Sequence, residues 1–246
     1  MNTPAIAFDR IRKTFGTHTA LSDFSLSVHE GELFGLVGIN GAGKTTLIKC
    51  LLDFATPDSG AIRIFGIPHV ETGARSHLAF LPERFLPPHY FTGRDFLRYM
   101  LTLHRCAFTA DRAAAMFDAL DLDVRALDLP VRSFSKGMTQ KLGLAACLLS
   151  DKRLYVFDEP TSGLDPKARA LLKAQLLALR EAGRTLFVTS HLLADVEQLC
   201  DRMAVLHGSA LRYVGTPKEF LAQYRTPDME QAFLRCIDVE GGDATA

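Results

Sequence analysis

The chain has 246 residues, of which 48% are hydrophobic, and its 28 basic side chains balance its 28 acidic ones. This length and composition fit a folded protein with a sizeable core, and they argue against a disordered or fibrous one. A formal net charge of zero gives no support to a nucleic-acid footprint or to binding of an anionic membrane surface.

The apolar runs are too short to cross a membrane, which takes about 18 residues. Residues 142–149 form one of the longest. The first four residues lack a basic region followed by an apolar core, so we expect no secretory signal. The cysteines are scattered without a C-x-x-C pair, which predicts reduced thiols in a cytosolic protein and membrane association only through a partner. They are Cys50, Cys106, Cys147, Cys200 and Cys236.

Short alternating patterns at residues 5–8 and 21–28 predict two antiparallel strands. Between them, Phe15 is expected on a turn over residues 13–16. Its ring either belongs to the core or stacks on a nucleotide base, and the local sequence favours the core.

A glycine-rich loop then follows an apolar run at residues 32–37 and precedes a predicted helix over residues 45–52. Its pattern is G-x-x-x-x-G-K-T, whose glycines let backbone N–H groups point at phosphate oxygens in front of a helix N-terminus. Lys44 is expected to reach the β- and γ-phosphates, and the Thr45 hydroxyl to bind Mg²⁺. The loop consists of Gly38, Ile39, Asn40, Gly41, Ala42, Gly43, Lys44, Thr45 and Thr46.

Residues 61–66 and 78–83 are predicted to be further strands, the second of which stops at Pro82 and delivers Glu83 to a loop. Apolar residues at helical spacing then predict a helical insertion from residue 92 to about 122.

Another helix is predicted to open at residues 133–140. Ser135 there either caps the helix or binds an anion with the free N–H groups, and the local sequence favours the cap.

Two carboxylates, Asp158 and Glu159, end the apolar run at residues 154–157. A buried parallel strand that ends in acids at its C-terminal edge is typical of catalysis in α/β sheets. Asp158 suits a water-mediated contact to Mg²⁺, and Glu159 suits polarising the attacking water.

Asp165 and Pro166 are predicted to start a helix that runs through Ala182. Residues 186–190 form a predicted strand with His191 at its C-terminal end, within reach of a γ-phosphate. Strands near residues 203–206 and 211–214 and short helices complete the chain, and the tail, residues 241–246, is expected to be frayed.

In the order and spacing of these segments, the chain resembles the ATP-binding subunit of ABC transporters, from about residue 5 to 225. Residues 38–46 are similar to the Walker A loop, and Asp158 and Glu159 to the Walker B aspartate and catalytic glutamate. The resemblance implies an α/β fold with a P-loop NTPase (RecA-like) core, an N-terminal antiparallel β subdomain and an inserted α-helical subdomain. We expect one ABC ATPase domain over residues 1–246, with the core in 1–85 and 152–246 and the insertion, which carries the signature motif, in 86–151.

Four further segments match the family in order. Phe15 looks like the adenine-stacking aromatic, Glu83 stands where the family has its Q-loop glutamine, residues 162–165 look like the D-loop, and His191 looks like the switch histidine. Residues 134–138 align with the L-S-G-G-Q signature, which closes over ATP held by another subunit. The resemblance implies that Lys44, Glu159 and His191 are catalytic, that Thr45, Glu83 and Asp158 bind Mg²⁺, and that ATP also contacts Ser135, Lys136, Gly137, Met138 and Asp165.

Two departures matter. Lys136 and Met138 replace a glycine and the glutamine of the signature, and Glu83 replaces the Q-loop glutamine. Both variants are similar to export-type members that act on drugs, polysaccharides or lipids, which favours export. A carboxylate can still bind Mg²⁺, so Glu83 is not expected to abolish activity.

The resemblance implies an ATPase on the cytoplasmic face of the membrane, bound to a separate transmembrane permease. One phosphate loop and one signature per chain predict a dimer, most simply of two identical copies. A docking patch for the permease is expected at Phe85, Leu86, Pro87, Phe91 and Thr92, although these residues fit the core of the helical subdomain equally well.

Two other functions fit the sequence less well. A soluble ABC-type ATPase acting on ribosomes or DNA usually has two ATPase halves or a long coiled-coil insertion, and this chain shows neither. Its neutral charge also argues against nucleic acid as a partner. A small GTPase is disfavoured because no N/T-K-x-D motif follows Asp158.

Overall fold

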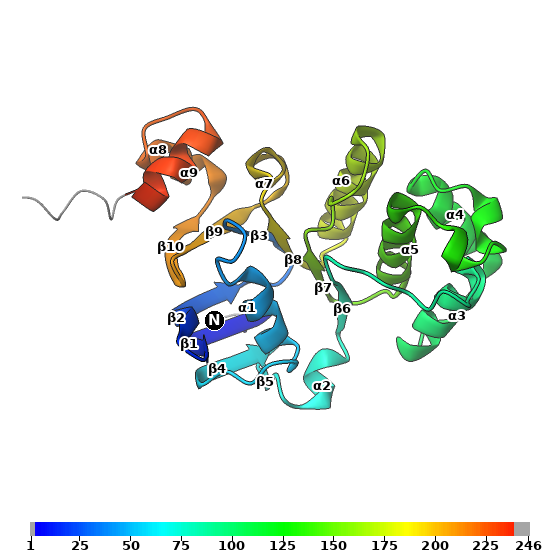
Figure 1. Ribbon diagram of the computed structural model, residues 1–246, viewed down its shortest axis with the longest axis horizontal. Coiled ribbons are helices and arrows are strands. Elements are labelled where there is room, and N and C mark those ends of the chain that lie inside the picture. The colour runs from blue at the N-terminus through cyan, green and yellow to red at the C-terminus, as the bar shows by residue number, and fades with distance from the viewer. Residues whose placement is uncertain (1–2, 239–246) are drawn as a thin grey trace, which may run out of the picture.

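The computed structural model describes residues 3–238, and the predicted frayed tail lies outside them. Figure 1 shows an antiparallel sheet and a mostly parallel sheet side by side. One group of helices, α3 to α5, lies at one end of the molecule, and α8 and α9 lie at the other.

The antiparallel sheet has the strand order β2-β1-β4-β5, and the predicted pairing of the first two strands is confirmed. Its core includes an edge-to-face contact between Phe8 and Phe24, with ring centroids 5.6 Å apart. The predicted turn at residues 13–16 is wrong, because the first strand runs on through Phe15 and the chain reverses at Gly16, whose φ is +58°. A bulge near Arg10, whose φ is +48°, interrupts the alternation of apolar and polar residues. The sequence pattern therefore does not reveal the full length of this strand. The strands are β1 (Ile6–Phe15), β2 (His18–Val28), β4 (Ser59–Ile64) and β5 (Ile67–Pro68).

The second sheet has the order β10-β9-β3-β8-β7-β6, and β10 is its one antiparallel strand. β3, β7 and β8 are buried along their whole length, as their continuous apolar sequences predict. Their C-terminal ends meet at one edge, which is where the sequence places its acids and the phosphate loop. The strands are β3 (Leu33–Val37), β6 (Leu78–Leu81), β7 (Leu154–Asp158), β8 (Thr185–Ser190), β9 (Arg202–His207) and β10 (Ala210–Gly215).

Among the helices that border the sheets, α6 and α8 begin at capping side chains. The Asp165 side chain accepts a hydrogen bond from Ala168 N at 2.9 Å, with Pro166 in the first turn, so α6 starts as expected. α8 begins with a capping box between Thr216 and Glu219. The helices that border the sheets are α1 (Lys44–Leu51), α2 (Thr72–Arg75), α6 (Pro166–Glu181), α7 (Leu193–Leu199), α8 (Pro217–Gln223) and α9 (Met229–Asp238).

The helical region consists of α3 (Gly93–Leu103), α4 (Ala110–Ala119) and α5 (Lys136–Leu149), with two short 3₁₀ helices at Val124–Leu127 and Val131–Ser133. The segment predicted to be helical from residue 92 to 122 is therefore interrupted. Arg105 has a φ of +59°, which ends the first helix, and the Thr109 side chain caps the second. The domain boundaries drawn at residues 85/86 and 151/152 stay predictions.

Candidate functional site

The phosphate loop connects the end of β3 to the start of α1. Gly43 has a φ of +111°, and a Cβ atom on it would lie 2.5 Å from the carbonyl oxygen of Ala20. A Cβ atom on Gly38 would lie equally close to the carbonyl oxygen of Leu206. Glycine is therefore required at both positions, because the loop curls tightly between β2 and β9.

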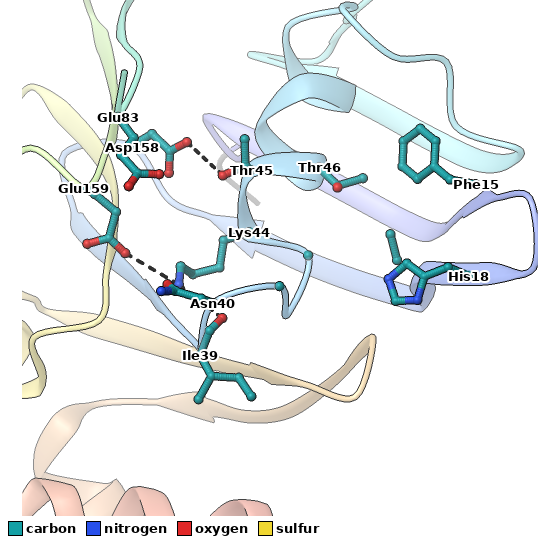
Figure 2. Close-up of a pocket in the computed structure, with 13 residues that line it drawn as sticks. Phe15, His18, Ile39, Asn40, Lys44, Thr45, Thr46, Glu83, Asp158 and Glu159 are labelled. Atoms are coloured by element: carbon teal, nitrogen blue, oxygen red, sulfur yellow. Dashed lines mark hydrogen bonds and ion pairs between the residues drawn. The ribbon is translucent and has the colours of Figure 1, made fainter. Parts of the chain in front are cut away.

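A pocket of about 480 Å³ opens in front of this loop. Figure 2 shows Phe15 and His18 at one end and the three carboxylates Glu83, Asp158 and Glu159 at the other, with Lys44 and Thr45 between them. Eleven of the predicted site residues thus share one pocket, and His18 and Ala20 join them without having been predicted. The lining consists of Phe15, His18, Ala20, Ile39, Asn40, Gly41, Gly43, Lys44, Thr45, Thr46, Glu83, Asp158 and Glu159.

The Lys44 side chain is buried and folds back over its own loop. Its Nζ atom donates to the carbonyl of Gly38 at 2.5 Å and lies 3.5 Å from Oε1 of Glu159. An ammonium group on the pocket wall, close to the loop's backbone N–H groups, suits binding of a polyphosphate.

Asp158 is held by two hydroxyl groups from different elements. Thr45 Oγ1 donates to its Oδ2 at 3.0 Å, and Thr189 Oγ1 donates to its Oδ1 at 2.6 Å. Thr189 also accepts a hydrogen bond from Glu159 N at 3.0 Å. Sequence reasoning missed Thr189, whose only signal is its place near the end of β8, two residues before His191.

The oxygen atoms of Thr45, Asp158 and Glu83 fit a Mg²⁺ ion, which prefers hydroxyl and carboxylate ligands. All three residues line the pocket. Within residues 3–238, no group of three or more histidine, cysteine or acidic side chains could hold a metal by itself. An ion here would therefore take further ligands from the nucleotide phosphates and from water.

Glu159 is 5% exposed and directly follows β7. Its φ of +51° is uncommon for a residue with a side chain. One carboxylate oxygen, Oε2, lies 2.7 Å from Nδ1 of His191 and 3.3 Å from that residue's backbone N. The other oxygen, Oε1, is buried and has no hydrogen-bond partner in the described part of the chain. A buried carboxylate beside a lysine and a histidine is suited to proton transfer.

Phe15 is half exposed, with 51% of its surface accessible, so it does not belong to the core. The Lys13 ammonium lies 5.2 Å from the centre of its ring. An exposed aromatic ring at the open end of a phosphate pocket offers a surface for a base.

The signature segment does not line the pocket of its own chain. Ser135 caps α5 by accepting a hydrogen bond from Met138 N at 3.2 Å, and Lys136 lies against Gly163, whose Cβ atom would sit 3.0 Å from Lys136 Cε. Asp165 is likewise away from the pocket, where its N-cap hydrogen bond from Ala168 N holds the pKa of its carboxyl below the usual range. Gly38, Ala42, Gly137, Met138 and His191 are also outside the lining.

The predicted docking patch is divided in the structure. Phe85 and Phe91 pack on the core of the helical region, and the ring of Phe85 lies 5.4 Å from that of Phe96. Leu86 instead is 82% exposed, and the neighbouring Tyr90 is 73% exposed. Leu86 and Tyr90 are thus the exposed large apolar side chains of residues 85–92. No helix in residues 3–238 is both long enough and apolar enough to cross a bilayer.

Comparisons with known proteins agree with this geometry. A protein-family profile described as ABC transporter matches residues 21–162, more than half of the chain. The chain is 36% identical over 236 residues to an ABC transporter ATP-binding protein of Nostoc sp., covering 92% of this chain and 70% of that protein. It is 34% identical over 226 residues to a Nod factor export ATP-binding protein of Ralstonia nicotianae, covering 89% of this chain and 70% of that protein. A solved structure of the ATP-binding subunit of an ABC transporter superposes with a TM-score of 0.88 at 27% identity, covering 94% of this chain and 99% of that one.

Proposed function

The chain belongs to the ABC transporter family as an ATP-binding subunit, and on this basis we propose that it hydrolyses ATP to drive export through a separate transmembrane protein. The observation that carries the proposal is the buried Glu159 carboxylate beside Lys44 of the phosphate loop. The direction follows the relative named for export. The cargo would be selected by the transmembrane partner.

ATP would enter the pocket with its base against Phe15 and its phosphates over the loop. The backbone N–H groups of the loop and the start of α1 would bind phosphate oxygens. Lys44 would release the Gly38 carbonyl and turn to the β- and γ-phosphates, a movement of a flexible side chain that leaves the backbone in place.

Mg²⁺ would be held by Thr45, Asp158 and Glu83, and when bound it neutralises charge on the phosphates. The residues of the chain keep these ligands in position. Thr189 fixes one oxygen of Asp158, so the other stays directed towards Thr45.

Glu159 would act as the general base that takes a proton from the attacking water. His191 holds Oε2 of that carboxylate, and it would contact the γ-phosphate when nucleotide is present. Because Glu159 is buried between these groups, few water molecules can reach its carboxylate, and one positioned water would be the proton donor.

A second copy of the chain would complete the site. Ser135, Lys136, Gly137 and Met138 lie outside the pocket of their own chain, and the free N–H groups at the start of α5 can bind phosphate oxygens held by another copy. Asp165, at the start of α6, would lie near the same contact. A symmetric pair of chains then has two equivalent sites.

The chain would work on the cytoplasmic face of the membrane, held there by its transmembrane partner. Leu86 and Tyr90 are exposed apolar side chains next to Glu83, so partner contact and nucleotide contact lie on one short segment. A shift of this segment on ATP binding would therefore be passed directly to the membrane protein.

Mixing two inactive variants tests the proposal. Lys44→Ala removes the ammonium group of the phosphate loop, and Ser135→Arg blocks the signature with a bulky side chain, so each protein alone should fail to hydrolyse ATP. In a mixed dimer both defects fall in one site and the other site is intact. Co-purified mixtures should regain about a quarter of wild-type turnover, because half of the dimers are mixed and each keeps one of its two sites. Full activity of either variant alone, or no recovery in mixed dimers, would contradict the shared site.

A further inference from the structure

Asp58 lies directly before β4 and binds three consecutive residues at the end of β1. Its backbone N donates to the carbonyl oxygen of Arg12 at 2.8 Å. Its carboxylate accepts a hydrogen bond from Thr14 N at 2.6 Å and forms an ion pair with the Lys13 ammonium at 3.0 Å. The next residue along the strand is Phe15, whose ring lies at the open end of the nucleotide pocket (Figure 2). Asp58 thus holds the part of the chain that carries this ring.

The pairing of β1 with its neighbours becomes irregular towards this end. Its last pair with β4 joins Arg12 to Ser59. On the other side, the register with β2 shifts between Lys13 and Thr14. A strand end without a regular ladder opens more easily than the middle of a sheet. The Asp58 carboxylate accepts from the Thr14 N–H, and it therefore replaces a strand partner at the point where pairing with β4 has ended.

The Lys13 side chain lies between the carboxylate and the aromatic ring. Its ammonium is 3.0 Å from Oδ1 of Asp58 and 5.2 Å from the centre of the Phe15 ring, within the range of a cation–π contact. Only 15% of the Lys13 side chain is exposed, so the ammonium has little freedom to move away. The Lys13 ammonium, and then the Thr14 N–H, hold the pKa of the Asp58 carboxyl below its usual range, so the ion pair persists at neutral pH.

The same segment connects the ring to the phosphate loop. α1 starts within that loop and ends at Leu51, and a short turn leads from there to Asp58. The turn is fixed to the helix, because the backbone N atoms of Phe54 and Ala55 both donate to the carbonyl of Lys49, at 2.8 and 3.1 Å. The position of the ring is therefore defined relative to the phosphate loop, as a ligand with a base at one end and phosphates at the other requires.

We propose that Asp58 and Lys13 are positioning residues for the nucleotide base, which hold the Phe15 ring in place before the base arrives. This inference rests on the proposed function, because that function places the base against Phe15. Neither Asp58 nor Lys13 is among the residues that line the pocket, so both would act through the ring. A ring that is already held loses little conformational freedom when a base stacks on it, and the base binds more tightly for that reason.

The Phe15→Trp variant tests the proposal without any nucleotide, because the native chain has no tryptophan. Time-resolved fluorescence anisotropy of the indole measures how freely the ring moves on the nanosecond timescale. Adding Asp58→Asn or Lys13→Met should lower the residual anisotropy, whereas adding Lys13→Arg keeps the cation and should leave it unchanged. Asp128→Asn is the matched control, since it breaks an exposed ion pair of 2.8 Å to Arg94 away from the pocket, and it should have no effect.

Ligand binding by chains that keep Phe15 gives the second measurement. Asp58→Asn should weaken ATP binding about threefold, the effect of losing one exposed ion pair. Pyrophosphate has no base, so its affinity should stay the same. Lys13→Met should show the same difference between the two ligands, and Lys13→Arg should restore ATP binding. A general loss of stability would instead lower both affinities, which separates positioning of the ring from support of the whole fold.

Two results would overturn the inference. One is an unchanged indole anisotropy in both Asp58→Asn and Lys13→Met, and the other is an equal loss of ATP and pyrophosphate affinity. If Asp58→Asn does not fold, Lys13→Met decides the question by itself. Both results would leave the proposed ATPase activity untouched. Loss of indole order in these variants, in a chain that never hydrolyses ATP, would refute the ATPase proposal and support the contact that holds the ring.

Discussion

Nδ1 of His191 lies 2.7 Å from Oε2 of Glu159, and the opposite oxygen of the same carboxylate lies 3.5 Å from the ammonium of Lys44. Glu159 thus stands between the phosphate-binding cation and the histidine. A γ-phosphate that attracts Lys44 would take this cation from Glu159 and leave the carboxylate to His191 and the attacking water. Nucleotide binding and preparation of the base would therefore be coupled through Lys44.

Glu159→Gln is expected to separate binding from turnover. The amide cannot accept the water's proton, so ATP hydrolysis should fall at least about 100-fold. Removing the carboxylate also removes its competition for Lys44, so ATP affinity should be unchanged or higher. Phosphate release and equilibrium ATP binding measure the two effects, with Glu230→Gln on the exposed face of α9 as a matched control. Normal hydrolysis by the Glu159→Gln variant would refute its assignment as the base.

Lys44→Ala is expected to lose ATP affinity at least about tenfold, because a charge-assisted contact to phosphate disappears. The Glu159 carboxylate also loses its nearby cation while it stays buried, so the free energy of unfolding should fall by about 1–3 kcal/mol. Titration with ATP and urea denaturation measure these effects. Lys49→Ala, an exposed lysine on the same helix, serves as the control. Unchanged nucleotide affinity in Lys44→Ala would contradict the function expected of the loop.

Thr189→Val replaces a hydroxyl by a methyl group of similar size. Asp158 would lose a hydrogen bond and Glu159 N would be left unpaired in a buried site, so the free energy of unfolding should fall by about 1–3 kcal/mol. Turnover should fall more than ATP affinity, because Asp158 and Glu159 are positioned by Thr189 while the phosphates are bound by the loop. Thr189→Ser keeps the hydroxyl and should restore both properties. Equal turnover in Thr189→Val and the native chain would show that the hydrogen bonds of Thr189 with Asp158 and Glu159 have no catalytic importance.

The contacts of Thr189 with Asp158 and Glu159 also show what the sequence could not predict. Walker-type spacing identifies Lys44, Asp158 and Glu159, since these motifs are local. Thr189 meets Asp158 because β7 and β8 pair in parallel with these two residues opposite each other. That register depends on how the strands assemble, and apolar runs of similar length do not define it.

The predicted fold is confirmed by the likeness to a solved ATP-binding subunit. Apolar runs next to glycine and proline predicted the buried strands well. The predicted helical character of residues 92–122 is confirmed by α3 and α4. The break between these two helices and the error at the turn over residues 13–16 arose where single residues with positive φ, Arg105 and Arg10, interrupt a regular element. Arginine is seldom found with a positive φ, so an arginine in the sequence does not indicate that a strand or helix is interrupted there.

Phe15→Ala is expected to weaken ATP binding about fivefold or more, the usual contribution of one base stacked on one aromatic ring. Pyrophosphate has no base, so its affinity should not change. Phe15→Tyr should retain stacking, and Phe54→Ala, which removes a 71% exposed ring outside the pocket, should have no effect. An equal loss of ATP and pyrophosphate affinity would mean that Phe15 supports the loop instead of the base.

The cysteines predict a chemical test of folding. All five are free, and burial raises the pKa of Cys147 to about 12 and raises that of Cys200, Cys50 and Cys236. A thiol with a raised pKa stays protonated as the pH rises through 8 and 9, so it cannot react as a thiolate. At pH 8, N-ethylmaleimide should modify these four thiols slowly in the folded chain and rapidly in urea. ATP should slow the reaction further if it stabilises the fold, and mass spectrometry counts the added groups. Rapid modification of Cys147 in the folded chain would show that α5 opens readily, contrary to the burial of this thiol in the core.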